Sequence, residues 1–176
     1  KVFGLTVGTA IISYVLPTGC RTGVTMSVID YPPAILGTMR ACPGQTTTLS
    51  DAVGGGAWTS GNTDIATVTS GGLVKGISSG PVTITYAMPG GCETYQPITV
   101  RPMPNAIAGA SAVCLAGTTT LTDMLPGGVW SSSDVTKGSI DAATGVVTGI
   151  GAGSFTVTYT VGTCFVTKAI TVGTIN

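Results

Sequence analysis

The chain has 176 residues, of which 27 are glycine and only 8% are charged, and its formal net charge is zero. A nucleic-acid-binding surface needs clustered basic residues to neutralise phosphates, so this composition argues against nucleic acid as a partner. Hydrophobic residues make up 43% of the chain, which is enough for a core and argues against disorder. No stretch of about 18 uninterrupted apolar residues occurs, so the sequence predicts no membrane-spanning helix.

One pattern occurs three times along the chain. It consists of a glycine-bounded turn, apolar residues that alternate with threonine or serine, a tyrosine, a small turn and a cysteine. The three copies lie at residues 4–20, 76–92 and 149–164. Cys20 and Cys92 are 72 residues apart, and so are Trp58 and Trp130. Self-similarity at a fixed spacing is typical of tandem structural repeats, so the sequence predicts an array of similar modules with a 72-residue period.

Every segment of a repeat has the pattern of a β-strand. Val82, Ile84 and Tyr86 alternate with threonines, and residues 155–159 follow the same pattern. Such alternation buries one face of a strand and exposes the other. Glycine and proline clusters separate the strands at intervals of roughly 8–12 residues, which is typical of a β-sandwich. Further strands are expected at residues 47–49, 65–68, 73–77 and 98–100. No window shows helical periodicity, so the predicted fold class is all-β.

Two proline-bearing segments separate the repeats, Tyr31-Pro-Pro33 and Arg101-Pro-Met-Pro104. Proline restricts the backbone and stiffens a short linker, so consecutive modules are expected to lie end to end with little swing. The opening residues match only the last part of a repeat. Such a remnant exposes sheet edges and an apolar face, and we expect it to need its missing strands or a neighbour. The predicted units are a partial module at 1–30 and complete modules at 31–102 and 103–176.

Three runs of the last repeat carry a family resemblance. They are Cys114-Leu-Ala-Gly-Thr-Thr-Thr-Leu-Thr-Asp123, Gly127-Gly-Val-Trp-Ser-Ser132 and Gly145-Val-Val-Thr-Gly-Ile-Gly-Ala-Gly-Ser-Phe-Thr-Val-Thr-Tyr159. In these runs the chain resembles bacterial immunoglobulin-like (Ig-like) domains, and it is most similar to those in very large surface and secreted proteins of Bacteroidota-type bacteria. The resemblance implies tandem Ig-like β-sandwich modules, an extracellular or cell-surface location, and work as stalks, adhesins or filaments. It supplies no catalytic residues.

Five aromatic residues recur at matching places in the repeats. Trp58 and Trp130 each follow a Gly-Gly pair, and we expect them to plug the core between two sheets rather than to stack on a sugar. Tyr14, Tyr86 and Tyr159 have the inward parity of their strands. Core packing is therefore the prediction for the tyrosines as well.

Cysteines in repeat positions favour an oxidising compartment. The disulfide candidates are Cys20, Cys42, Cys92, Cys114 and Cys164. One possible scheme closes each module, pairing Cys42 with Cys92 and Cys114 with Cys164. In an immunoglobulin strand order these partners lie at opposite poles, roughly 20 Å or more apart, whereas a disulfide needs Cα atoms within about 7 Å. The other scheme joins Cys42 to Cys164 across the joint, with Cys20 and Cys114 bonded to modules beyond this segment. The sequence leaves both schemes open.

Catalytic, cofactor and metal sites have no convincing candidates in the sequence. Histidine is absent, and no serine or cysteine has an evident general base. The joints offer Asp30 and Asn105 as oxygen ligands, which are too few for calcium. We therefore predict that the chain is not an enzyme and needs neither cofactor nor metal.

The sequence favours a structural function. We expect a repeat segment of an extracellular filament, stalk or giant cell-surface adhesin, whose partners are neighbouring modules of the same protein in a homopolymer or filament. The alternative is a carbohydrate-binding β-sandwich module of a secreted protein. In that case Tyr31, Tyr95 and Phe165 are the candidate aromatic contacts for surface glycans.

Overall fold

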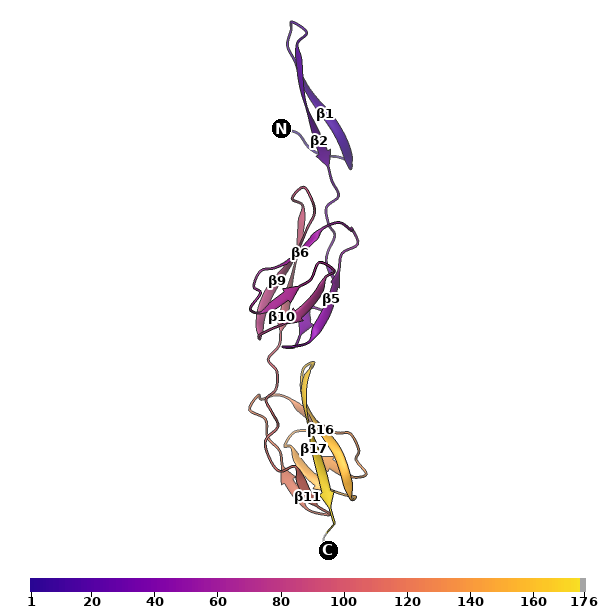
Figure 1. The fold of residues 1–176 in the computed structure, drawn as a ribbon, viewed down its shortest axis with the longest axis vertical. Helices are drawn as coiled ribbons and strands as arrows, with labels where there is room; N and C mark the ends of the chain where they lie inside the picture. Colours follow the sequence, from indigo (N-terminus) through magenta and orange to yellow (C-terminus); the bar gives the residue numbers. More distant parts are fainter. Residues whose placement is uncertain (175–176) are drawn as a thin grey trace.

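The computed structural model describes residues 1–174, and this part of the chain contains strands and turns but no helix. Three β units follow one another along the long axis of the molecule, from the N-terminal hairpin to the C-terminal sandwich (Figure 1). The prediction of an all-β fold is therefore confirmed. Over the same residues, nothing has the length and apolar character of a helix that crosses a membrane.

The N-terminal unit is an antiparallel hairpin of β1 (Gly8–Val15) and β2 (Arg21–Val28). The strands pair from Gly8 opposite Val28 to Val15 opposite Arg21. At the turn, the Leu16 N–H donates a hydrogen bond to the carbonyl oxygen of Cys20 at 2.8 Å. Almost every residue of the two strands is exposed, because this sheet has only two strands and no second sheet covers it.

The central unit is a sandwich of two four-stranded sheets, ordered β4-β10-β9-β6 and β3-β5-β8-β7. Its strands are β3 (Leu36–Gly37), β4 (Arg40–Ala41), β5 (Thr46–Ser50), β6 (Ala57–Ser60), β7 (Ala66–Val68), β8 (Leu73–Gly76), β9 (Gly80–Ala87) and β10 (Glu93–Val100). Strand β4 runs parallel to β10, and β9 runs antiparallel to it. Inward side chains of both sheets meet in one core around Leu49, Val74 and Ile84.

The C-terminal unit is a second sandwich, with one sheet ordered β11-β17-β16-β13 and another ordered β12-β15-β14. Its strands are β11 (Ala112–Cys114), β12 (Thr118–Thr120), β13 (Val129–Ser132), β14 (Gly138–Ile140), β15 (Val146–Gly149), β16 (Gly153–Val161) and β17 (Cys164–Gly173). Its core is separate from the central one and is built around Leu121, Val147 and Ile170. Each sandwich therefore buries its own apolar residues.

A tryptophan packs against a tyrosine of the adjacent strand in each sandwich. The ring centroids of Trp58 and Tyr86 lie 4.6 Å apart, and those of Trp130 and Tyr159 lie 4.4 Å apart, in tilted arrangements that aromatic pairs favour. Tyr86, Trp130 and Tyr159 are buried, and Trp58 is half-buried. The four residues thus occupy corresponding places in the two cores.

Each of these tyrosines also ties a loop to the core. The Tyr86 hydroxyl donates to the carbonyl oxygen of Val53 at 2.8 Å and accepts the N–H of Gly56 at 2.9 Å. Asp51 shapes this loop, because its Oδ1 accepts the N–H of Val53 at 2.9 Å. Glycine is required at position 56, where a Cβ would lie 2.5 Å from the Tyr86 ring. The C-terminal sandwich repeats the arrangement around Tyr159.

Tyr14 departs from the prediction that it packs in a core. Its side chain is 69% exposed, whereas Tyr86 and Tyr159 are 4% and 5% exposed. Tyr14 does lie on the face of its strand that corresponds to the buried face of β9, since both hairpins pair in the same register. The parity was therefore predicted correctly, but the strands that would cover this face are not among residues 1–174.

Candidate functional site: a disulfide between two sandwiches

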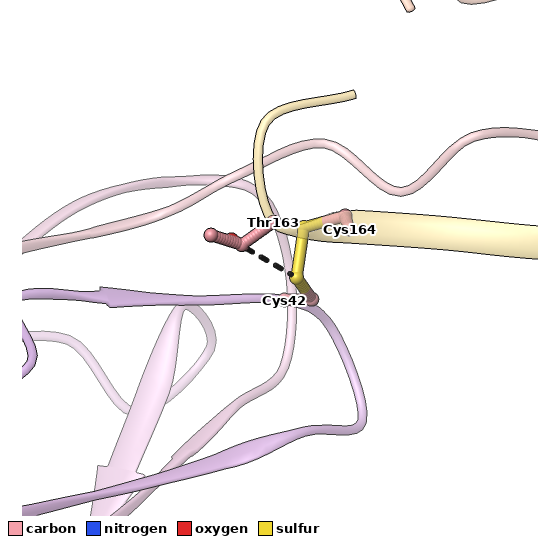
Figure 2. The surroundings of a disulfide bond; sticks show 3 residues. All are labelled: Cys42, Thr163 and Cys164. Atoms are coloured by element: carbon pink, nitrogen blue, oxygen red, sulfur yellow. Dashed lines mark hydrogen bonds between the residues drawn. A yellow bond between two sulfur atoms is a disulfide. The ribbon is translucent and has the colours of Figure 1, made fainter. Parts of the chain in front are cut away.

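A disulfide between Cys42 and Cys164 joins the central sandwich to the C-terminal one. The two Cα atoms are 5.6 Å apart, although the residues are separated by 122 positions in the sequence. Figure 2 shows the bond beside Thr163, whose Oγ1 lies 3.8 Å from the Cys42 sulfur. Of the two schemes that the sequence leaves open, the structure thus contains the pairing across the joint.

The strand arrangement explains why Cys42 does not pair with Cys92. Cys42 follows β4, whose last residue, Ala41, is paired with Val100 at the end of β10. Cys92 comes directly before β10 begins. The eight residues of β10 separate the two cysteines by roughly 25 Å at about 3.3 Å per residue. A disulfide within the module is therefore geometrically excluded.

The β16–β17 hairpin carries Cys164 to the neighbouring sandwich. Cys164 is the first residue of β17 and is paired with Val161, so only Gly162 and Thr163 form the turn. Gly162 has a φ of 65°, a conformation that glycine adopts more readily than other residues. The tight turn places the cysteine at the tip of the hairpin, where it meets the end of β4.

The disulfide is shielded from solvent by both partners. Cys42 is 6% exposed and Cys164 is 1% exposed. A small open cavity of about 260 Å³ lies beside the bond, and Met103 and Phe165 are among its lining residues. Burial limits the access of other thiols to the sulfurs, so we expect the bond to exchange slowly.

Arg101 forms a second contact across the joint. A Cβ added to Gly162 would lie 3.1 Å from the Arg101 guanidinium, so the arginine packs directly against the turn that precedes Cys164. The backbone N–H of Arg101 donates a hydrogen bond to the carbonyl oxygen of Ala41 at 2.8 Å. This bond fixes the linker to the end of β4, next to Cys42. The sequence analysis did not predict this contact. The small residues before each cysteine were the feature that could have indicated it.

The remaining cysteines have no disulfide partner within residues 1–174. Cys20 and Cys114 are exposed, and Cys92 is half-buried. Their places in the fold match those of the bonded pair: Cys114 ends β11 as Cys42 follows β4, and Cys92 follows the turn after β9 as Cys164 follows the turn after β16. Each sandwich therefore presents one cysteine at each pole.

The three aromatic residues considered for glycan binding are all exposed. Tyr31, Tyr95 and Phe165 have more than half of their surface accessible. Tyr95 donates a hydrogen bond to Glu93. This bond, burial, and the nearby charges of Glu93 and Tyr31 raise the pKa of Tyr95. Tyr31 lies in the linker at the first joint, Tyr95 lies near the start of β10, and Phe165 lines the cavity at the second joint.

Metal-binding geometry is absent from the described part of the chain. No group of three or more His, Cys, Asp or Glu side chains lies close enough there to hold a metal ion. Asp51 and Asp123 instead cap turns, since each accepts the backbone N–H two residues ahead. The disulfide joint is thus the feature with the clearest chemistry.

The comparison with solved structures found similar proteins. A crystallised C-terminal 282-residue fragment of intimin, in complex with the intimin-binding domain of the translocated intimin receptor, is 14% identical over 81% of this chain and 64% of the fragment, with a TM-score of 0.55. Domains 4 and 5 of the S-layer protein SbsC are 17% identical over 81% of this chain and 99% of that chain, with a TM-score of 0.40. The chain spans 36% of a longer SbsC fragment, domains 1–6.

The intimin likeness indicates a shared Ig-like fold. The comparison with curated proteins found no match. The family model described as bacterial Ig-like domain (group 2) matches residues 44–88 and 96–172, which together make up more than half of the chain. Both sandwiches and their Trp–Tyr pairs lie largely within these matched residues. The chain belongs to the bacterial Ig-like domain (group 2) family.

Proposed function

We propose that this chain is a structural repeat segment of an extracellular filament, stalk or giant cell-surface adhesin, in which disulfides fasten each Ig-like module to the next. The observation that carries the proposal is the Cys42–Cys164 bond, which connects two separately folded cores instead of closing either one. A bond across a joint limits the angles that two modules can adopt. Repeated along an array, such joints make a stiff rod rather than a string of freely moving beads.

The composition of the surface supports self-association. With 8% charged residues and no net charge, little like-charge repulsion opposes lateral or end-to-end packing. We therefore propose that the partners are neighbouring modules of the same protein, in a homopolymer or filament, with module boundaries at 1–30, 31–102 and 103–176. A disulfide fits an extracellular or cell-surface location. We assign no enzymatic activity, and the resemblance to large surface proteins of Bacteroidota-type bacteria fits this proposal.

Small-angle X-ray scattering and electron microscopy of the oxidised chain test the structural role. The wild-type chain is expected to scatter as an elongated particle of fixed length and to form beaded rods or fibres at high concentration. Reduction is expected to broaden the distance distribution without unfolding the sandwiches. Wild-type particles that bend freely about the second joint while the disulfide is intact would contradict the proposal.

A carbohydrate-binding role is the second candidate, and the exposed rings of Tyr31 and Tyr95 favour it. Such rings can stack on the apolar face of a sugar. A glycan array probed with the intact chain tests this function, with Tyr95→Ala as the matched variant. Binding that is lost in the variant would support the role, and no binding by the folded wild-type chain would eliminate it.

A further inference from the structure

The N-terminal hairpin has the backbone geometry of the hairpins that complete the two sandwiches. Strand β1 pairs with β2 from Gly8 opposite Val28 to Val15 opposite Arg21, just as β9 pairs with β10 from Gly80 to Ala87. Gly8 has a φ of 145°, and its counterparts Gly80 and Gly153 have φ values of 154° and 128°. The hairpin therefore already has the shape of the two central strands of one Ig-like sheet.

The face that would line this core is apolar and open to solvent. Ala10, Ile12 and Tyr14 point to the same side as Val82, Ile84 and Tyr86 of β9, because the two hairpins share one register. Ile12 is 41% exposed, whereas Ile84 is completely buried. On β2, Met26 also belongs to this face and is 43% exposed. We name the surface formed by Ala10, Ile12, Tyr14 and Met26 the open face.

Residues before β1 already approach the hairpin as a strand of the opposite sheet would. In the central sandwich a Cβ on Gly76, at the end of β8, would lie 3.1 Å from Val100 and 2.5 Å from the carbonyl oxygen of Cys42. Gly4 has the corresponding contact with Val28, at 2.8 Å. The carbonyl group of Cys42 fills the space beside Gly76. No group of residues 1–174 fills the equivalent space beside Gly4.

Cys92 lies at the joint between the N-terminal hairpin and the central sandwich. Its position relative to the hairpin matches the position of Cys164 relative to the central sandwich. A Cβ on Gly90 would lie 2.6 Å from Ile29, so the turn before Cys92 packs against the linker that follows β2. At the second joint, Gly162 packs in the same way against Arg101, the counterpart of Ile29. The close approach of the turn before Cys164 to the preceding linker is thus repeated in the turn before Cys92.

We infer that the open face and Cys92 together form a docking site for a donor segment of the same repeat, a polypeptide with the strands that correspond to β3–β7. The donor covers the open face, stacks its tryptophan on Tyr14 and places its cysteine beside Gly4, where it forms a disulfide with Cys92. The two thiols lose two protons and two electrons in this step; a disulfide of an exchange partner accepts them and becomes two thiols, or molecular oxygen of the oxidising compartment accepts them and becomes hydrogen peroxide.

The chemistry of the site specifies this donor more narrowly than an arbitrary apolar partner. The Tyr14 hydroxyl corresponds to that of Tyr86, which needs both a carbonyl acceptor and a glycine N–H donor. The donor therefore needs an Asp-capped loop and a glycine before its tryptophan. Residues 31–72 of this same chain have all of these features, from Cys42 and Asp51 to Gly56 and Trp58.

A fusion with residues 31–72 repeated directly ahead of Lys1 provides the test. Lys1 corresponds to Leu73, so the junction keeps the normal spacing of a module. We expect the repeated Cys42 to form a disulfide with Cys92, which alkylation without reduction and peptide mapping would detect, leaving only Cys20 and Cys114 reactive. Amide exchange in β1 and β2 is expected to slow by about 100-fold or more, because a lone hairpin is marginally stable.

Two variants of the fusion separate docking from mere tethering. Changing Trp58→Ala in the repeated segment only is expected to reduce the protection of β1 and β2, and Tyr14→Ala should have the same effect. A control fusion in which residues 73–102 replace residues 1–30 gives the donor the hairpin it already fits. If this control folds and forms the disulfide with Cys92 but the original fusion does not, the inference is overturned. Protection of β1 and β2 in the unfused chain by pairing with a second hairpin would also overturn it.

This inference rests on the Cys42–Cys164 disulfide that underlies the proposed function. The inference and the proposed function can nevertheless fail separately. Mapping of the Cys42–Cys164 peptide in the unfused chain tests this disulfide alone. If that peptide is present while the control fusion succeeds and the fusion ahead of Lys1 stays unprotected, the rod proposal stands and the docking site does not.

Discussion

Cys42 and Cys164 lie 5.6 Å apart at Cα, and each belongs to a different sandwich. The backbone between them passes through most of both sandwiches before it returns to the joint. A contact of this kind does not decide how either module folds. It decides how two folded modules are held relative to each other.

Replacing one bonded cysteine is expected to loosen the joint and leave both cores intact. In Cys164→Ser the sandwiches remain connected by the linker and by the contact between Arg101 and Gly162. The maximum dimension from small-angle scattering should then become broadly distributed. A chain-entropy estimate for a cross-link over about 120 residues gives on the order of 4–5 kcal/mol of lost stability against complete unfolding.

Cys114→Ser is the matched control for this variant, because Cys114 is exposed and unbonded in the described chain. It should leave both the scattering profile and the free energy of unfolding unchanged. If Cys164→Ser also scatters like the wild type, the linker and Arg101 alone hold the angle, and the disulfide is not needed for stiffness.

The five cysteines are expected to differ sharply in reactivity. Cys20 and Cys114 are exposed and should react with iodoacetamide within minutes, and half-buried Cys92 should react more slowly. Cys42 and Cys164 should stay unmodified until a reductant is added, since both are bonded and buried. Mass spectrometry of unreduced peptides checks the pairing. A peptide that links Cys42 to Cys92 would show that the chain adopts the other scheme in solution.

Gly56→Ala is expected to destabilise the central sandwich by roughly 1–3 kcal/mol, because the new methyl group overlaps the Tyr86 ring and the loop must shift. Denaturant unfolding followed by tryptophan fluorescence measures the change. Gly54→Ala is the control within the same loop, because a Cβ there meets no atom within 4 Å. Equal effects of the two substitutions would mean that the Tyr86 contact is not what requires glycine at position 56.

Acid is expected to weaken the C-terminal sandwich before the central one. The Thr144 hydroxyl, followed by the N–H groups of Thr144 and Ala143, lowers the pKa of Asp141. The Thr136 hydroxyl and N–H lower the pKa of Asp134 in the same way. Since both carboxyls have a lower pKa in the folded state, their contribution is present above the unfolded value of 3.8. It is lost as the pH falls through the lower folded values.

The central sandwich has uncharged residues at the matching positions, which makes it an internal control. Asn62 corresponds to Asp134 and caps its turn through Oδ1, and Thr69 corresponds to Asp141. We expect Asp134→Asn and Asp141→Thr together to flatten the pH dependence of C-terminal unfolding between about pH 2 and 5. Amide exchange resolved by sandwich provides the readout, and a wild-type chain whose two sandwiches lose stability in parallel would contradict this prediction.

The alternation of side chains was sufficient to predict the strands that form the cores. Val82, Ile84 and Tyr86 are buried, and the intervening threonines face outward because strand side chains alternate. The pole at which each cysteine lies also followed from the strand order. These features depend on local pattern, which one repeat contains in full.

The pairing of the cysteines could not be derived in the same way, because it depends on the rotation of one module about the next. Contacts such as Arg101 against Gly162 depend on that rotation, and the alternation of side chains along a strand does not encode it. The prediction that Tyr14 is buried was wrong for a related reason. Its parity follows from β1 alone, but its burial depends on strands that lie outside the hairpin.

The disulfide also determines where tension would pass through the molecule. From the turn at Cys20, a covalent path runs through β2 to Cys42, crosses to Cys164 and continues along β17. These strands are already close to full extension. Residues 43–163 form a closed loop beside this path, so a pull along the axis cannot draw them out. Only after the bond between Cys42 and Cys164 is broken could unfolding of the two sandwiches draw out these residues, about 400 Å of chain at full extension.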